Sequence, residues 1–399
     1  MEQNNRKYIA LIAFLRKFIS VFFSLFFNVY ILKIVNNDLN FILKYTVFSV
    51  ILGLIFEYVV LKIINSKNAK IIYQASFPLL VICIITLMVF KEKIVNYIFI
   101  FKAIHTLATI CYSAPYELMI IGSNSNKTMS TFLANLIILE SITTILTPIF
   151  SGFIIDTFSY YTFFVFLVLE AILIILVSLK IKNVTVSDKK MKLKEFWSKA
   201  KKRKPIKDIY NCMFFRRIST QGAMTELLPI ILFLKLGTEL DLGAYNSFFA
   251  ILSIMSLQIL KWINRKNIEK KFYPYLAIVI FISSVFVVYN SSFTTLLIYY
   301  ILMNTFGAVI ESEACSAVYA VVTVDNLAEY RKEHIFTYNI YMTIGQLISY
   351  GLVYVLYNYF YNVNILSITV AVLMFFLIIS TIYLRKTQRY LYEVEKQRS

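Results

Sequence analysis

Residues 71–90 read IIYQASFPLLVICIITLMVF, an apolar run without a charged side chain. A helix of about 20 residues rises about 30 Å, which is the thickness of the hydrocarbon core of a bilayer. A second run of this kind, NILSITVAVLMFFLIISTIYL, covers residues 364–384. The whole chain is 59% apolar and 16% charged, whereas soluble domains are about 45–50% apolar and about 25% charged. These features predict an all-α integral membrane protein and argue against a soluble two-domain enzyme.

Further apolar segments, separated by short polar breaks, predict twelve transmembrane helices in two six-helix halves. The expected spans are residues 8–34, 40–61, 71–90, 94–121, 131–155, 160–180, 209–236, 244–262, 272–290, 294–322, 334–359 and 363–384. The expected domains are an N-terminal bundle (1–180), a basic cytoplasmic linker (181–208), a C-terminal bundle (209–384) and a cytoplasmic tail (385–399). The linker contains MKLKEFWSKAKKRK, which suits either an amphipathic helix on the membrane surface or a solvated connection.

The positions of lysine and arginine test this count, because these residues accumulate on the cytoplasmic side of a membrane. With both termini cytoplasmic, most of the 40 Lys and Arg residues fall on the inner side. The cations expected on the outer side are Lys33, Lys44, Lys91, Lys93 and Lys235. The net charge of +18 therefore reflects topology and not a nucleic-acid partner. A multi-pass protein of a bacterial plasma (inner) membrane is expected, and the Ile-, Lys- and Asn-rich composition agrees with an AT-rich bacterial source.

A short basic tag occurs twice, as LKIINSKN at 61–68 and as LKWINRKN at 260–267. Each copy closes an even-numbered span on the expected cytoplasmic side. Other pairs of similar short segments occur in the same order and at a similar separation along the chain, such as LRKFIS at 15–20 and FFRRIS at 214–219. Two parallel six-span halves explain this repeat. The tag residues singled out are Lys62, Asn65 and Lys67 in the first copy, and Lys261, Asn264, Arg265 and Lys266 in the second.

Three stretches resemble the major facilitator superfamily. The tags stand where that family has a loop motif ending Asp-Arg-x-x-Arg-Lys, although Lys62 and Lys261 occupy the slots of its aspartate. TILTPIFSGFIID (144–156) resembles the Gly-Pro-x-x-Gly-Gly motif of efflux members. There, Pro148 and Gly152 match the motif, while Thr147 and Ser151 replace glycines. CYSAPYELMI (111–120) and NSNKTMSTFLAN (124–135) are similar to the macrolide-efflux and enterobactin-exporter-like branch.

A charge inside a membrane span requires a partner or a water-filled cavity. The resemblance implies that spans 1, 4, 7 and 10 line a central cavity. The candidate cavity or gate charges are Arg16, Lys17, Glu57, Arg216, Arg217, Glu311 and Glu313. Their depths allow Arg16 to pair with Glu57, and one arginine of span 7 to pair with a glutamate of span 10. Structural ion pairs, a cytoplasmic gate and contact with a charged substrate all remain open.

Lys102 and His105 are one turn apart on span 4 and lie near the middle of the membrane. Glu140 of span 5 is expected at a similar depth. A carboxylate near a lysine and a histidine can exchange a proton as its surroundings alternate between wet and dry. These three residues are the candidates for proton coupling. The alternatives are a fixed pair between Glu140 and Lys102, or a His105 side chain that snorkels or hydrogen-bonds to the backbone.

No nucleotide-binding loop, nucleophile motif or metal-ligand cluster is found in the sequence, and the four cysteines lie inside apolar blocks. We therefore expect no enzyme activity, no cofactor and no metal. The resemblance implies a secondary active transporter that exports a small amphiphilic compound by alternating access, in exchange for protons. A dedicated transporter of an anionic metabolite, siderophore or peptide, a lipid flippase, and a non-transporting membrane partner are the alternatives. A monomer in the lipid bilayer is expected.

Overall fold

The computed structural model describes residues 3–122, 127–181, 188–265, 272–324, 327–359 and 365–398. Within these ranges it is built from helices and contains no strand. The chain forms two compact units. The first unit holds Met1–Met191 and Leu232–Ser247, and the second holds Lys192–Ile231 and Phe248–Ser399. The segment Leu232–Ser247, which the sequence places in the C-terminal bundle, thus packs with the first unit.

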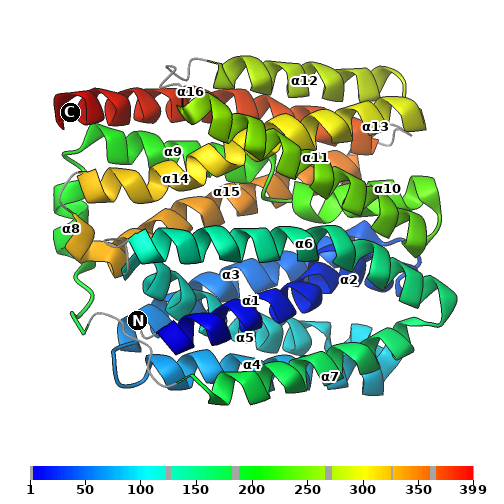
Figure 1. The fold of residues 1–399 in the computed structure, drawn as a ribbon. Coiled ribbons are helices and arrows are strands. Elements are labelled where there is room, and N and C mark those ends of the chain that lie inside the picture. The colour runs from blue at the N-terminus through cyan, green and yellow to red at the C-terminus, as the bar shows by residue number, and fades with distance from the viewer. Residues whose placement is uncertain are drawn as a thin grey trace. The chain divides into compact units, whose positions relative to one another are not determined.

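The first unit is a bundle of helices that follow the expected apolar segments (Figure 1). They are α1 (Gln3–Val21), α2 (Phe27–Ile34), α3 (Leu39–Ile63), α4 (Ala69–Phe90), α5 (Ile98–Gly122), α6 (Lys127–Thr157) and α7 (Tyr160–Leu179). α4 packs against α5 and α7, and α1 packs against α6 and α7. Asp38 directly precedes α3, and its carboxylate accepts the N–H of Phe41 at 3.3 Å and so caps the helix.

The second unit is also a bundle of helices, and a short helix precedes it. Its elements are α8 (Leu193–Ala200), α9 (Lys204–Ser219), α10 (Met224–Leu236), α11 (Glu239–Arg265), α12 (Tyr273–Tyr289), α13 (Phe293–Leu302), α14 (Ala308–Val324), α15 (Arg331–Tyr359) and α16 (Ile365–Arg398). α9 packs against α14, α15 and α16, and α16 also packs against α12 (Figure 1). The last residues of α10 and the first turns of α11 belong to the first unit.

Length and hydropathy agree with a membrane protein. In the described ranges, eight stretches are long and apolar enough to cross a bilayer, and Ala69–Leu118 among them contains α4 and most of α5. Large apolar side chains also lie on the outside of the helices, for example Val89 at 68% exposure and Leu179 at 65%. Lipid, not water, is the natural neighbour of such a surface. The helical membrane class is confirmed, while the count of twelve and the side of the termini stay predictions.

Three of the charge-bearing spans are not regular helices. A π-helical turn (Phe22–Phe26) separates α1 from α2, and another (Met303–Gly307) separates α13 from α14. Residues 220–223 interrupt the helix between α9 and α10. Such irregularities expose backbone groups and occur often at functional positions. They point to these spans as the place to look for a site.

The linker forms α8, which packs on the start of α15. Phe196 is fully buried, and the indole N–H of Trp197 donates to Thr337 Oγ1 at 2.8 Å. The hydroxyl of Tyr330 and the ammonium groups of Lys199 and Lys192 stabilise the Glu195 carboxylate, and these contacts lower its pKa to about 2. α8 is therefore anchored to the second unit and is not a free connection.

Candidate functional site

The break between α9 and α10 is held open by α15. A Cβ atom on Gly222 would lie 2.4 Å from the carbonyl oxygen of Arg217 and 2.7 Å from Ser349 Oγ, so only glycine fits there. Ser349 is fully buried. Its hydroxyl donates to the Ile218 carbonyl at 2.8 Å and accepts the Ala223 N–H at 3.0 Å. The side chain thus replaces backbone hydrogen bonds that the break removes.

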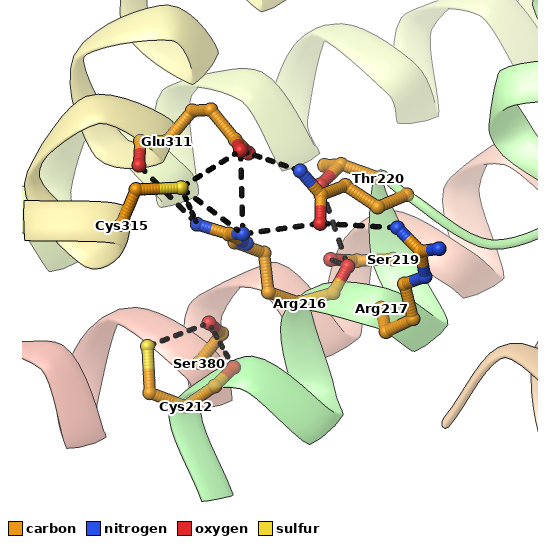
Figure 2. Close-up of polar contacts among 9 residues, drawn as sticks. Cys212, Arg216, Arg217, Ser219, Thr220, Glu311, Cys315 and Ser380 are labelled. Atoms are coloured by element: carbon orange, nitrogen blue, oxygen red, sulfur yellow. Dashed lines mark hydrogen bonds and ion pairs between the residues drawn. The ribbon is translucent and has the colours of Figure 1, made fainter. Parts of the chain in front are cut away.

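Arg216, at the edge of this break, forms an ion pair with Glu311 of α14 (Figure 2). Its Nη2 lies 3.2 Å from Glu311 Oε1, and the guanidinium is 2% exposed. Gln221 connects the two groups, because its amide oxygen accepts from Arg216 at 3.0 Å and its amide nitrogen donates to Glu311 at 2.5 Å. Cys315 lies 3.7 Å from Arg216 Nη2. Of the pairings expected between spans 7 and 10, the structure shows this one.

Arg217 lies beside this pair but has different partners. Its Nε donates to Gln346 Oε1 at 3.1 Å, and its Nη1 donates to Gln221 Oε1 at 3.4 Å. Among the described residues, no carboxylate forms an ion pair with it, and Glu311, the ion-pair partner of Arg216, acts on its charge only from a longer distance. The guanidinium is half-buried. Neutral amides therefore orient a positive charge that they do not compensate.

The first unit holds a second arginine of this kind. The guanidinium of Arg16 lies 3.5 Å from the ring centroid of Tyr112, which is a close cation–π contact. The expected pairing of Arg16 with Glu57 is not seen, and Glu57 lies buried on α3. Lys17 interacts electrostatically with Glu140 of α6. The Tyr112 ring thus holds Arg16, while the next residue, Lys17, interacts with the Glu140 carboxylate.

The proposed proton-coupling residues are only partly brought together. Lys102 Nζ lies 4.3 Å from the ring centroid of Phe27 and 4.9 Å from that of Tyr45. The His105 ring packs on Phe23 with centroids 4.1 Å apart. Both residues are on α5, whereas Glu140 interacts with Lys17. Lys102 and His105 therefore share one aromatic environment, and Glu140 belongs to another.

Two further intramembrane carboxylates have distinct surroundings. Glu313 is 5% exposed and accepts a hydrogen bond from Gln388 Nε2 of α16 at 2.9 Å. Glu170 is buried on α7, and its Oε2 has no hydrogen-bond partner in the part of the chain that the structure describes. An ionised carboxylate in that position would be costly without a partner.

The Pro148–Gly152 stretch of α6 is a helix-packing surface. A Cβ on Gly152 would lie 2.4 Å from the carbonyl oxygen of Glu239, the first residue of α11. Thr147 and Ser151 are fully buried in the same turn of α6. The Glu239 carboxylate also binds Lys33 and Tyr160. Residues from α2, α6 and α7 thus hold the start of α11.

Comparison with known proteins decides the family. A model of the Major Facilitator Superfamily matches residues 9–350. The chain belongs to the Major Facilitator Superfamily. A solved structure of a bacterial metal transporter has a TM-score of 0.67 at 12% identity and covers 97% of this chain and 99% of its own. A bacterial homologue of the iron transporter ferroportin, crystallised in an inward-facing state, has a TM-score of 0.66 at 11% identity, with 98% and 99% covered.

These two structural neighbours share the fold with this chain, and identities this low carry no substrate with them. A search of curated proteins gives no match. Membership of the Major Facilitator Superfamily identifies the chain as a membrane transporter, which agrees with the expectation of a non-enzymatic protein. Its substrate must be argued from the residues themselves.

In this Major Facilitator Superfamily protein the first tag forms a turn. Asn65 and Asn68 bond each other across it, with the Asn65 N–H donating to Asn68 Oδ1 at 2.8 Å. Lys62 lies 5.6 Å from the Tyr58 ring centroid, and the Lys67 N–H donates to Asn65 Oδ1 at 2.9 Å. Lys261, Asn264 and Arg265 lie on α11, and Lys266 lies outside the described residues.

The turn of the first tag also binds a carboxylate that the tag does not contain. Asp188 of the linker accepts the Ser66 N–H at 2.7 Å and the Ser66 hydroxyl at 3.0 Å. The family's loop motif has an aspartate in this region, and here the tag has Lys62. A residue more than a hundred positions away thus brings a carboxylate to this loop. Sequence reasoning missed Asp188, because only the fold brings it there.

Gln221, Gln346 and Ser349 are also functional candidates that the sequence analysis missed. A polar interruption in an apolar span, STQG at 219–222, is the signal that would have revealed the break. No such signal exists for Gln346 and Ser349, which lie in the regular helix α15.

Proposed function

We propose that this member of the Major Facilitator Superfamily is a secondary active transporter that exports a small amphiphilic compound with an anionic group, in exchange for protons. The observation that carries the proposal is the environment of Arg217. Its described partners are amides of Gln346 and Gln221, and the neighbouring Arg216 takes the Glu311 carboxylate. The charge of Arg217 is thus available to a ligand.

The chemistry of guanidinium supports an anionic substrate. A guanidinium presents a planar set of donors that matches a carboxylate or phosphate with two parallel hydrogen bonds. Gln346 fixes Arg217 through Nε, which leaves Nη donors for a ligand. Arg16 in the first unit is held by Tyr112 and also lacks a carboxylate partner among the described residues. Each unit therefore holds one oriented cation.

Export and proton exchange rest on other residues. The Pro148–Gly152 stretch resembles the efflux motif, and its backbone packs directly against that of α11. Glu140 interacts electrostatically with Lys17, and Glu170 is buried with an oxygen that has no hydrogen-bond partner among the described residues. A carboxylate whose charge state depends on a neighbouring cation, or on access to water, can couple transport to protons.

The proposed substrate class is inferred from the two arginines and not from the substrates of the structural neighbours. Those proteins are described as metal and iron transporters. Within the described ranges of this chain, no group of three or more His, Cys, Asp or Glu residues is placed to hold a metal. A broad exporter and a dedicated carrier of one anionic metabolite, siderophore or peptide share the proposed chemistry and differ in how many acids they accept.

A thermal-shift screen with matched pairs of amphiphilic acids and their methyl esters tests the proposal on the purified protein. We expect at least one acid to raise Tm while its ester does not. Arg217→Gln should abolish the shift, Arg217→Lys should retain part of it, and Arg203→Gln in the exposed linker should leave it unchanged. Equal shifts with acids and esters, or an unchanged shift in Arg217→Gln, would overturn the anionic substrate.

A further inference from the structure

The last helix is longer than a membrane requires. α16 runs from Ile365 to Arg398 without a break, over 34 residues. At about 1.5 Å per residue it is about 51 Å long, while the hydrocarbon core is about 30 Å thick. Its last 14 or so residues therefore continue beyond the core. The segment 385–399, expected as a tail, is helical as far as Arg398.

One face of this extension is fixed to the second unit. Leu384 and Thr387 are fully buried, and Leu391 is 8% exposed. Gln388 Nε2 donates to Glu313 Oε2 of α14 at 2.9 Å. The extension is thus a rigid part of the second unit, and its other face has a fixed orientation.

The other face carries a groove of about 570 Å³ that is lined mostly by cations. Its lining includes Ile382, Arg385, Lys386, Arg389, Tyr392 and Lys396. They recur at three- and four-residue spacing, so they form one stripe along the helix. The carboxylate of Glu393 also lines the groove and pairs with Arg389 at 2.9 Å. The cations of the groove outnumber this single acid.

The stripe changes from apolar to basic where the helix leaves the hydrocarbon. Ile382 is 44% exposed at the apolar end, and Tyr392 is 42% exposed among the cations. Arg385 and Lys386 follow the expected end of the span at residue 384, which places them at headgroup depth. A phospholipid has a matching order of groups, because its apolar acyl chain is followed by a negatively charged phosphate.

We propose that this groove binds the headgroup of an anionic phospholipid. Arg385 and Lys386 pair with the phosphate, and Ile382 contacts the start of the acyl chain. A free phosphate has the same charge but no apolar part, so it gains nothing from Ile382. The proposal concerns the membrane boundary and does not depend on what the transporter carries.

Titration of delipidated full-length protein with phosphatidylglycerol, phosphatidylcholine or inorganic phosphate tests the proposal, with native mass spectrometry and Tm as readouts. Phosphatidylglycerol should bind and raise Tm, and the other two should not. The double variant Arg385→Gln/Lys386→Gln should bind phosphatidylglycerol roughly 30-fold more weakly, which corresponds to about 1 kcal/mol per cation. It leaves the Arg389–Glu393 pair intact.

The matched control is Lys201→Gln/Lys202→Gln, which removes the same charge from the exposed linker. This control should bind phosphatidylglycerol like the wild type. Unchanged binding in the groove variant, or an equal loss in the control, would contradict a lipid site in the groove. A Tm shift with inorganic phosphate as large as that with phosphatidylglycerol would show a site for free anions instead.

Discussion

Gly243 of α11 lies so close to Pro148 of α6 that a Cβ atom on Gly243 would stand 2.2 Å from the Pro148 carbonyl oxygen. Gly152 makes the reciprocal contact with the backbone of Glu239. Glycines on both helices let the two backbones touch, as small residues do in other membrane helix pairs. The efflux-like motif therefore acts in this structure as the surface on which α11 packs.

Gly243→Leu should separate these helices. The new side chain has no space against Pro148, and overpacking of this kind costs about 1–3 kcal/mol. Thermal unfolding in detergent should show a lower Tm and transport should fall. Gly351→Leu is the matched control, because no atom lies within 4 Å of a Cβ built there. Equal Tm values for the two variants would contradict the close crossing.

Ser349→Ala should destabilise the break between α9 and α10. The change leaves the Ile218 carbonyl and the Ala223 N–H without their buried partner, which costs about 1–3 kcal/mol. Ser283→Ala provides the control, since Ser283 is buried but bonds only the carbonyl of Ile280 in its own helix. The measurement compares the denaturation midpoints of the two variants. If Ser349→Ala lowers the midpoint no more than Ser283→Ala does, the hydrogen bonds of the Ser349 hydroxyl do not stabilise the break between α9 and α10.

Glu311→Gln should leave the buried charge of Arg216 without a carboxylate. We expect a loss of about 1–3 kcal/mol, less than for a fully buried pair, because the Glu311 side chain is 38% exposed. Adding Arg216→Met should restore most of the stability, since it removes the uncompensated charge and keeps an apolar chain of similar length. If the double variant unfolds more easily than Glu311→Gln alone, the ion pair is not the source of the loss.

The docking of α8 should depend on pH through Glu195. Its contacts with Tyr330, Lys199 and Lys192 lower its pKa from the ordinary 4.5 to about 2. A carboxyl group with a lowered pKa in the folded state stabilises the fold above its ordinary pKa and loses this effect as pH falls toward the folded value. Docking should therefore be constant from pH 7 to 5 and weaken between pH 4.5 and 2.

The emission of Trp197 reports this transition in a protein with Trp262→Phe, because the chain has two tryptophans. Trp197 donates its indole N–H to Thr337 in the docked state. Glu195→Gln should remove the pH dependence in this window. A transition of the same size and midpoint in Glu195→Gln would mean that another group controls docking.

The sequence predicted the features that depend on local pattern. Apolar length located the helical segments. The irregular turns in spans 1, 7 and 10 were not predicted. The Arg216–Glu311 pair was among the expected ones because both residues lie at similar depth on neighbouring spans.

The partners of other charges were not predictable, because they depend on side-chain direction and on contacts far apart in the chain. Depth alone allowed Arg16 to pair with Glu57, yet Tyr112 holds it. Asp188 reaches Ser66 across a separation of 122 positions. The contact of Leu232–Ser247 with the first unit likewise follows from packing at Gly152 and Gly243, and no local pattern encodes it.

Flux in proteoliposomes with an imposed proton gradient tests the central claim most directly. For an acid identified by its Tm shift, we predict transport that depends on the gradient, that its methyl ester does not share, and that Arg217→Gln abolishes while Arg217→Lys retains in part. Transport of acid and ester at equal rates, flux that is independent of the gradient, or unchanged flux in folded Arg217→Gln would contradict an anion exporter coupled to protons.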